Sequence, residues 1–383
     1  MRVLFTHDNK FYRYQDKYTS TGLNYGIFKR YLNVFESMII CGREIRVSTS
    51  NDLKGNVASG NKVNFANIIN KNAIKIYYNK SDNYHIERLV KSSGFLIARL
   101  DSIIGFRAIY YAKKHGIPYA IELCTDPWDC YINYGWKGKI LAPWITHLTK
   151  KEVKQASNVI YVTNDYLQQK YPCTNNTIAI SNVECTPVQE VASKNKIKYS
   201  NRTSDQSLTL GTAGALLPFK GQRFVIEAMH LLDQQGFNYI HYRLAGNGND
   251  IKILKRLVKK YNLENRVEFC GTLNSDEMKE FYDSLDIYIQ PSLQEGLPRT
   301  VIEAMSRGLC CLGSRTAGIP ELLPEKRIFN KKDYKAIAEM IKALSKEDMI
   351  GDSKRNFEES KKYDKEILEK RRTNYFTKII RNP

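Results

Sequence analysis

Residues 286–324 read DIYIQPSLQEGLPRTVIEAMSRGLCCLGSRTAGIPELLP, and this stretch gives the clearest indication of the fold class. A short apolar run, DIYIQ, ends at a Pro-Ser pair, and a polar loop then leads into a helical pattern. This pattern starts near Pro298, because proline is tolerated in the first turn of a helix. A second apolar run, CCLGS, follows at 310–314. Strand, helix and strand in this order predict one unit of a parallel α/β sheet.

Two glutamates belong to this unit: Glu295 in the loop and Glu303 in the helix, with seven residues between them. The amides of Gly296 and Leu297 lie where the helix begins, and unpaired N–H groups there favour an anion such as a phosphate. Glycine at 296 also lets a ligand approach the backbone closely. Each glutamate alone is typical of a solvated surface acid. The whole order of strand, Gly-Leu-Pro and helix instead indicates a site for a phosphate and a ribose.

The same alternation of short apolar runs and helical patterns extends outward through both halves of the chain. The expected strands are 1–6, 95–99, 119–124, 159–163, 177–181, 208–212, 239–245, 267–270, 286–290 and 310–314. The expected helices include 22–37, 107–115, 221–234 and 250–261. Between the halves, residues 184–207 are polar and show no sustained period, which is typical of a linker.

We therefore expect two Rossmann-like, doubly wound parallel-sheet domains. The expected boundaries are 1–190 for an N-terminal domain, 191–207 for the linker, 208–362 for a C-terminal domain, and 363–383 for a C-terminal helix that could pack back on the first domain. Ligands of open parallel sheets bind beyond the carboxyl ends of the strands, so two facing sheets would form one central cleft.

Composition excludes several other classes of protein. With 383 residues, 42% hydrophobic and 26% charged, the chain is expected to fold as a globular protein rather than stay disordered. Uncharged stretches are too short to span a bilayer and no signal peptide is apparent, so a cytoplasmic location is expected. The eight cysteines and six histidines show no metal-ligand or disulfide spacing.

The segment 286–324 resembles the nucleotide-sugar signature of retaining glycosyltransferases of family four, which have the two-domain GT-B fold. The likeness extends to GTAGALLPFKG at 211–221, YRLAGNG at 242–248 and NRVEFCGTL at 265–273. The block VTNDYLQQKYP at 162–172 is similar to that of bacterial capsule and O-antigen members.

This resemblance implies a role for each matching position in the C-terminal half. Lys220 would neutralise the donor diphosphate, with Gly296 and Leu297 donating amides to it. Glu295 would lie near the sugar and the leaving diphosphate, and Glu303 would hold the ribose. Contacts that select UDP or GDP would come from the loop at Thr272 and Leu273. The sequence itself does not decide between these nucleotides.

Two departures from the family pattern affect the other expected site residues. The family often has an arginine where this chain has Ala215, so a second cation would have to come from Arg223 or Arg299. In the N-terminal half Gly22 is matched to a donor-contacting glycine loop. The family's His-Asp pair falls in ELCTDPWD at 122–129, where the histidine is absent and Asp126 is the expected inward carboxylate.

The implied activity is transfer of a sugar from a nucleotide diphosphate, with retention of configuration, to a polyprenyl-linked surface-polysaccharide acceptor. No DxD pair is present, so neither a metal ion nor another resident cofactor is expected. A GT-B nucleotide-sugar epimerase is the first alternative, and the Glu-x7-Glu spacing argues against it. A basic nucleic-acid-binding protein is the second, and no binding module supports it.

The formal net charge is +19, and residues 1–200 hold 28 of the 59 basic but only 15 of the 40 acidic residues. A basic N-terminal half favours an anionic partner, such as a nucleic acid, an anionic membrane surface or a phosphorylated ligand, but a solvated basic surface without such a partner explains the charge equally well. The segment WKGKILAPWITHLTKKEVK at 136–154 mixes tryptophans and aliphatic residues with lysines, which suits a helix lying on anionic lipid at the inner face of the cell membrane. A core-packing helix with a basic rim explains the same pattern, so both interpretations stay open.

Overall fold

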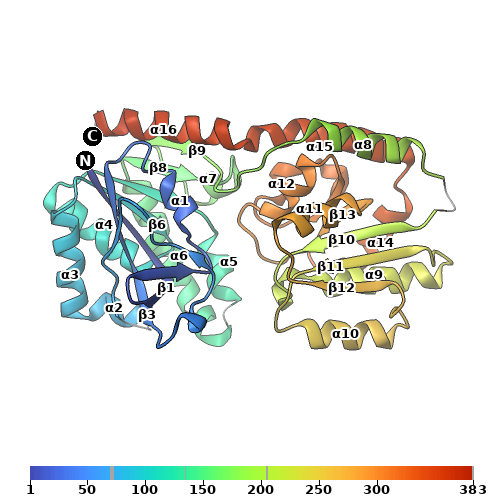
Figure 1. Cartoon of the computed structure of the whole chain (residues 1–383), viewed down its shortest axis with the longest axis horizontal. Helices are drawn as coiled ribbons and strands as arrows, with labels where there is room; N and C mark the ends of the chain where they lie inside the picture. The colour runs from blue at the N-terminus through green and yellow to red at the C-terminus, as the bar shows by residue number, and fades with distance from the viewer. Residues whose placement is uncertain (70–72, 134, 204–205, 382–383) are drawn as a thin grey trace. The chain divides into compact units, whose positions relative to one another are not determined.

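The computed structural model describes residues 1–69, 73–133, 135–203 and 206–381. They form two compact units (Figure 1). The N-terminal unit is Met1–Ile180 together with Glu369–Pro383, and the C-terminal unit is Ser181–Leu368. Both are built on largely parallel sheets with helical crossovers, which confirms the predicted α/β class with two Rossmann-like domains.

The sheet of the N-terminal unit has the order β4-β2-β1-β6-β7-β8-β9, and β3 pairs with β1 and β5. Its strands are β1 (Arg2–Tyr14), β2 (Lys17–Ser20), β3 (Ser37–Arg46), β4 (Asn56–Val57), β5 (Val63–Phe65), β6 (Phe95–Leu100), β7 (Tyr119–Leu123), β8 (Asn158–Tyr161) and β9 (Asn176–Ala179). Its helices are α1 (Tyr25–Lys29), α2 (Ala73–Tyr78), α3 (Lys80–Lys91), α4 (Ile103–His115), α5 (Pro127–Ile132), α6 (Gly135–Gln155) and α7 (Tyr166–Lys170).

The beginning of the chain differs from the sequence prediction. The first strand does not stop at Thr6 but continues past an irregularity to Tyr14 and pairs with the antiparallel strand β2. The helix expected at 22–37 is limited to α1, and the chain then enters β3, which was not predicted. Of the apolar residues at the predicted helical spacing, Leu23, Tyr31 and Phe35 are buried although they lie outside the short helix α1.

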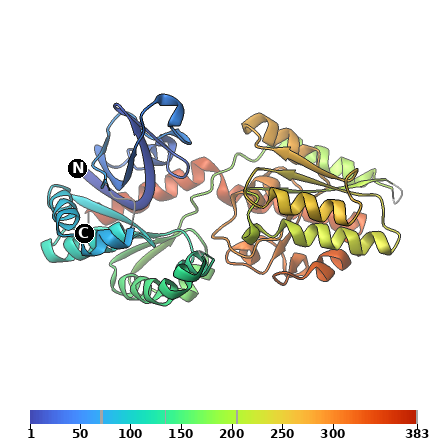
Figure 2. The same cartoon turned by 90° about the horizontal axis from the view of Figure 1, so that it is seen from below.

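The C-terminal unit contains a parallel sheet of order β12-β11-β10-β13-β14-β15. Its strands are β10 (Leu208–Ala213), β11 (Ile240–Ala245), β12 (Val267–Gly271), β13 (Ile287–Gln290), β14 (Cys310–Ser314) and β15 (Ile328–Phe329). Its helices are α8 (Gln189–Ser200), α9 (Gln222–Gln234), α10 (Ile251–Lys260), α11 (Ser275–Asp283), α12 (Arg299–Ser306), α13 (Ile319–Leu322), α14 (Tyr334–Lys342) and α15 (Lys346–Ser360). Helices α9 and α10, yellow in Figure 2, lie side by side over one face of this sheet.

Chain order and spatial order together place the switch point of the C-terminal sheet. Successive strands run outward from β10 through β11 to β12, and then the chain returns to the other side of β10 as β13. Ligands of such sheets bind at the carboxyl ends of the two strands that flank this reversal. A ligand of this unit is therefore expected at the loops that follow β10 and β13.

The predicted linker at 191–207 is wrong in one respect, since most of α8 lies within it. Only Ala192, Asn195 and Tyr199 of α8 are buried, which is too few apolar residues to give a helical period. Polar side chains anchor the helix instead. Asn195 Nδ2 donates to the carbonyl of Arg307 (2.7 Å), and the Tyr199 hydroxyl donates to the carbonyl of Asp286 (2.7 Å).

The last helix, α16 (Lys365–Arg381), begins in the C-terminal unit and ends in the N-terminal unit. Its Phe376 is fully buried and contacts the rings of Tyr31, Phe35 and Phe95, which belong to the other chain segment of that unit, Met1–Ile180. None of the helices in the described ranges combines the length and the apolar character that crossing a membrane requires.

Candidate nucleotide-sugar site

The loops after β10 and β13 are held together by their backbones. The amide of Leu293 donates to the carbonyl of Phe219 (2.7 Å). Gly221 adopts a φ of +72°, and a Cβ built there would lie 2.1 Å from the carbonyl oxygen of Pro291. Glycine is therefore required at 221 both for its left-handed backbone and for this close approach. As a result the end of the first loop, with Lys220, lies against the start of the second.

Lys220 and Glu295 form an ion pair across these two loops. Lys220 Nζ donates to Glu295 Oε1 at 2.6 Å, and the same oxygen accepts from Ser292 Oγ (2.7 Å) and Gln290 Nε2 (2.9 Å). The Glu295 side chain is 9% exposed and that of Lys220 is 22% exposed. These two residues are 75 positions apart in the sequence. Lys220 was predicted to bind the donor diphosphate and Glu295 to lie near the sugar and that diphosphate, and the structure brings the two into contact.

The loop that carries Glu295 ends at the uncapped start of α12. Pro298 is the N-cap residue and supplies no side-chain hydrogen bond. The amides of Gly296 and Leu297 have no hydrogen-bond acceptor among the described residues. A third loop fixes this segment, since the amide of Gly318 donates to the carbonyl of Gly296 (2.9 Å). Free amides at a rigid helix start form a local environment that favours a phosphate.

Glu303 lies on the second turn of α12, and its carboxylate is partly buried. The Tyr282 hydroxyl, from α11, donates to Glu303 Oε2 at 2.8 Å. Burial raises the pKa of Glu303, although the hydrogen bond from Tyr282 and the charge of Arg299 act in the opposite direction. The Tyr282 hydroxyl thus fixes Oε2 of Glu303, and the other carboxylate oxygen, Oε1, can accept hydrogen bonds from hydroxyl groups of a ligand.

The remaining C-terminal candidates occupy different situations. Arg223 is paired within its own helix, donating to Glu227 (2.9 Å), and is not joined to Lys220 or Glu295. Arg299 is exposed in the first turn of α12 and forms no ion pair within the ranges that the structure covers. Leu273 is half-buried two residues after Gly271, whose carbonyl accepts from the amide of Gly246 (2.6 Å).

Asp126 in the N-terminal unit is fully buried and holds its own surroundings together. Its Oδ1 accepts from the Trp128 amide (3.0 Å), as the N-cap of α5, and from the Tyr171 hydroxyl (2.6 Å). Its Oδ2 accepts from the Tyr166 hydroxyl (2.7 Å) and from Lys170. Burial opposes ionisation, but these hydrogen bonds outweigh it and lower the pKa of Asp126. The structure thus shows a structural task for this carboxylate, and its catalytic role stays a prediction.

Gly22 lies in a bend between β2 and α1 rather than directly after the first strand. Its amide donates to Ser20 Oγ (3.1 Å).

Asp101 directly follows β6 at its carboxyl end and was not among the predicted site residues. Burial and the neighbouring charges of Asp8 and Asp126 raise the pKa of Asp101 to about 6. A single aspartate after an apolar run gives no signal that would have separated it from an ordinary loop acid.

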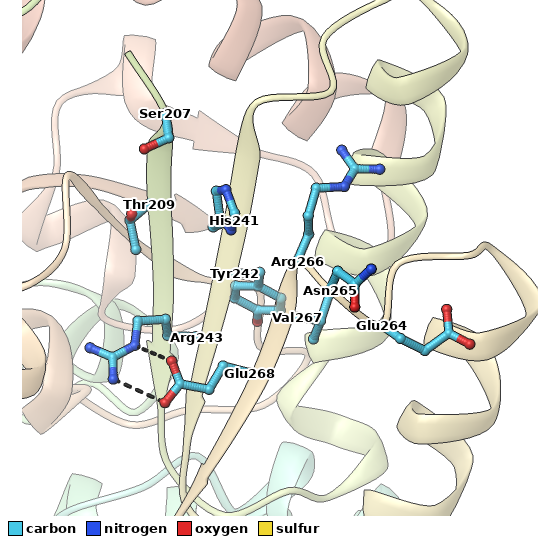
Figure 3. A pocket seen from close by; sticks show the side chains of 10 residues that line it. All are labelled: Ser207, Thr209, His241, Tyr242, Arg243, Glu264, Asn265, Arg266, Val267 and Glu268. Atoms are coloured by element: carbon cyan, nitrogen blue, oxygen red, sulfur yellow. Dashed lines mark hydrogen bonds and ion pairs between the residues drawn. The ribbon is translucent and has the colours of Figure 1, made fainter.

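A hollow of about 460 Å³ crosses the amino-terminal part of the strands β10, β11 and β12 (Figure 3). The side chains of Arg243 and Glu268 meet inside it in a two-point ion pair, with Arg243 Nε donating to Glu268 at 2.6 Å. Ser207 and Thr209 mark the start of β10, so this hollow is not at the ends of the strands where a donor would bind. It is separate from the Lys220–Glu295 site.

Two loops at the carboxyl ends of neighbouring strands, a partly buried Lys220–Glu295 ion pair and a helix start with free amides thus meet in one α/β unit. Comparison with known proteins specifies its class. A family model described as "Glycosyl transferases group 1" matches residues 193–364. The protein CapJ of Staphylococcus aureus is 33% identical over 347 residues, which cover 89% of this chain and 85% of CapJ. The chain belongs to the group 1 glycosyltransferases.

Two further similarities are informative. A Campylobacter jejuni N,N'-diacetylbacillosaminyl-diphospho-undecaprenol alpha-1,3-N-acetylgalactosaminyltransferase is 22% identical over 298 residues, covering 74% of this chain and 76% of that enzyme. The structure of Anabaena HepE in complex with UDP-glucose superposes with a TM-score of 0.65 at 14% identity, covering 99% of this chain and 100% of that one. The second likeness shows the fold. The family assignment favours the transferase over the epimerase and the nucleic-acid-binding alternatives.

Proposed function

We propose that this glycosyltransferase moves a sugar from a UDP- or GDP-sugar to a growing, polyprenyl-linked surface polysaccharide, with retention of configuration and without a metal ion. The observation that carries the proposal is the Lys220–Glu295 pair at the switch point of the C-terminal sheet, beside the free amides that begin α12. The name of the Campylobacter enzyme, which includes a sugar linked through diphosphate to undecaprenol, supports the acceptor class.

In this proposal the residues of the C-terminal unit divide the donor among them. Lys220 and the amides of Gly296 and Leu297 bind the diphosphate, because they supply positive potential at one end of the sheet. Glu303 accepts from the ribose hydroxyls. Leu273 lies near the base. Arg299 is favoured over Arg223 as the second cation, because Arg299 is the first residue of α12 and so follows these amides closely, whereas Arg223 lies on α9.

Transfer requires the nucleoside diphosphate to leave with the electron pair of the glycosidic bond. Lys220 and the α12 amides act where that negative charge develops. Because Glu295 already holds Lys220 at 2.6 Å, the cation needs little reorganisation when the donor arrives. We propose front-face attack, in which the leaving phosphate accepts the proton of the acceptor hydroxyl. Double displacement would need a carboxylate nucleophile on the other face of the sugar, and Asp126 is enclosed by Lys170, Tyr166 and Tyr171.

Nucleotide binding tests this proposal directly, in EDTA-containing buffer so that no divalent ion contributes. At a ligand concentration of 100 Kd, UDP or GDP, or a sugar derivative of one of them, should stabilise the protein by about 2.7 kcal/mol. Thermal-shift measurements should show an increase in Tm of roughly 5–10 °C. Glu303→Ala and Lys220→Ala should lose most of this increase, and Lys252→Ala, an exposed lysine on α10, should keep it. The donor proposal fails if no uridine or guanosine ligand raises the Tm, or if both site variants respond like the unmodified protein.

The acceptor side of the proposal includes a membrane-binding surface on α6. This helix buries the stripe Gly138, Ala142, Ile145, Thr149 and Val153. On its solvent side Trp136 is 69% exposed and Ile140 is 67% exposed. Lys137 and Lys139 are exposed between them, whereas Trp144 packs edge-on against Tyr77. Both earlier interpretations of this segment therefore have support, and its exposed end has the composition of an interfacial anchor.

We expect the protein to sediment with vesicles that contain anionic lipid, and we expect a much smaller fraction of it to sediment with neutral vesicles. Each lysine near an anionic surface contributes about 1 kcal/mol, and the two large apolar side chains add burial. Replacing both Trp136 and Ile140 by alanine should weaken vesicle binding by about tenfold or more. Tyr110→Ala, which removes a 53% exposed aromatic residue from α4, is the matched control. Equal and negligible sedimentation with both lipid types would contradict the anchor.

A further inference from the structure

Gln290 is a buried glutamine at the end of β13, 1% exposed, and every hydrogen-bonding position of its amide is used. Its Nε2 donates to Glu295 Oε1 (2.9 Å) and to Ser292 Oγ (2.8 Å). Its Oε1 accepts from the hydroxyls of Tyr288 (2.7 Å) and Thr300 (3.1 Å). An amide has two donor hydrogens and two acceptor lone pairs, so this group is saturated.

The partners of Gln290 fix which way its amide points. If the amide were flipped, its carbonyl oxygen would face the carboxylate of Glu295, and two acceptors would be in contact. The contacts therefore allow one orientation, with the NH2 group towards Glu295. A buried polar group with all of its partners in place is rigid, because moving it would leave several groups unsatisfied.

The partners also come from the parts of the C-terminal unit that form the candidate site. Thr300 belongs to the first turn of α12, and Ser292 and Glu295 belong to the loop after β13. The Tyr288 hydroxyl in turn accepts from the amide of Ala213, at the end of β10, at 3.3 Å. One side chain thus links the end of β10, the start of α12 and the carboxylate that holds Lys220.

We infer that Gln290 is a positioning residue of the transferase: it sets the position of Glu295, and through Glu295 that of Lys220, together with the first turn of α12. This inference rests on the proposed function of the Lys220–Glu295 site. Misplacement of a catalytic group by about 1 Å can cost on the order of 100-fold in rate. Loss of Gln290 should therefore reduce kcat much more than it weakens nucleotide binding.

Hydrogen–deuterium exchange on the free protein tests the positioning role without any substrate. Gln290→Leu keeps the size of the side chain but removes all four hydrogen bonds. Exchange at residues 291–302 should become at least about tenfold faster. Tyr242→Phe is the matched control, because it removes a fully buried hydroxyl that donates to Thr212 Oγ1 (2.7 Å) in the same sheet. Unchanged exchange in Gln290→Leu, or equal acceleration at 291–302 in Tyr242→Phe, would overturn the inference whether or not the protein is active.

The kinetic test measures release of UDP or GDP from the nucleotide sugar by the full chain. Gln290→Leu should lose about 100-fold in kcat while the nucleotide Kd changes less than threefold, and Tyr242→Phe should keep its kcat. Gln290→Glu places a second carboxylate beside Glu295, so its activity should recover as the pH falls and a proton is shared between the two. A kcat within threefold of the unmodified protein overturns the role of Gln290. If the unmodified protein neither binds nor consumes any donor, the proposed function fails, and the exchange measurement still judges the positioning role.

Discussion

Lys220→Ala is expected to reduce release of the nucleoside diphosphate from the sugar donor by about 100- to 1,000-fold in kcat. The reason is the position of this cation. Lys220 Nζ is fixed by Glu295 at 2.6 Å in a pair that is mostly shielded from water, and shielding strengthens its interaction with developing negative charge. Alanine removes the charge and leaves the Glu295 carboxylate to Ser292 and Gln290, which can still hold it in place.

Initial-rate measurements with saturating donor would check this expectation. Lys252→Ala removes an exposed lysine from α10 of the same unit and serves as the control for net charge. A double variant, Lys220→Ala with Glu295→Gln, should lose little more activity than Lys220→Ala, because both residues act through one pair. A Lys220→Ala protein that keeps more than half of the normal kcat would remove this lysine from the mechanism.

The strands of the C-terminal sheet could be predicted well for a physical reason. Parallel strands are covered on both faces, so they appear in the sequence as short continuous apolar runs such as IYIQ in β13 and CCLGS in β14. In the N-terminal unit the hairpin of β1 and β2 escaped prediction, because its residues alternate charged and aromatic side chains without a turn signal such as Asn-Gly. Helix α8 escaped because two polar anchors, Asn195 and Tyr199, replace an apolar stripe.

The residues of the candidate site in the C-terminal unit could be predicted from the sequence, but the residues that support them could not. The spacing of Glu295 and Glu303 and the start of the helix indicated one part of the site, and the family resemblance added Lys220, which the structure joins to Glu295. Their supporting residues, Gln290 and Tyr282, could not be predicted, because they depend on which side chains at neighbouring strand ends and helices meet in space.

Asp126 shows the opposite limit. Its motif suggested an inward carboxylate, but the residues that surround it, Tyr166, Lys170 and Tyr171, follow 40 to 45 positions later in the chain. Nothing in the sequence near Asp126 indicates that its two oxygens are already engaged. A local motif thus identifies a residue type and a strand end, whereas the availability of that residue is a property of the folded unit.

Phe376→Ala is expected to lower the unfolding free energy of the N-terminal unit by about 3–5 kcal/mol, the usual cost of truncating a buried phenylalanine. Phe376 is fully buried, and its ring lies 5.8 Å from that of Tyr31, 5.7 Å from that of Phe35 and 6.3 Å from that of Phe95. These contacts attach the end of the chain to a unit whose other residues precede Ser181. Alanine would leave a cavity at that junction and remove the edge-to-face contacts with these three rings.

Urea unfolding followed by tryptophan fluorescence measures this effect selectively, because the three tryptophans, at positions 128, 136 and 144, all belong to the N-terminal unit. The midpoint should fall while the slope of the transition stays unchanged. Ile367→Ala is the matched control on the same helix, since Ile367 is 47% exposed and its loss should shift the free energy by less than about 0.5 kcal/mol. If Phe376→Ala unfolds at the same urea concentration as Ile367→Ala, then α16 does not stabilise the N-terminal unit. In that case Glu369–Pro383 would be an appendage of the sheet and not part of its core.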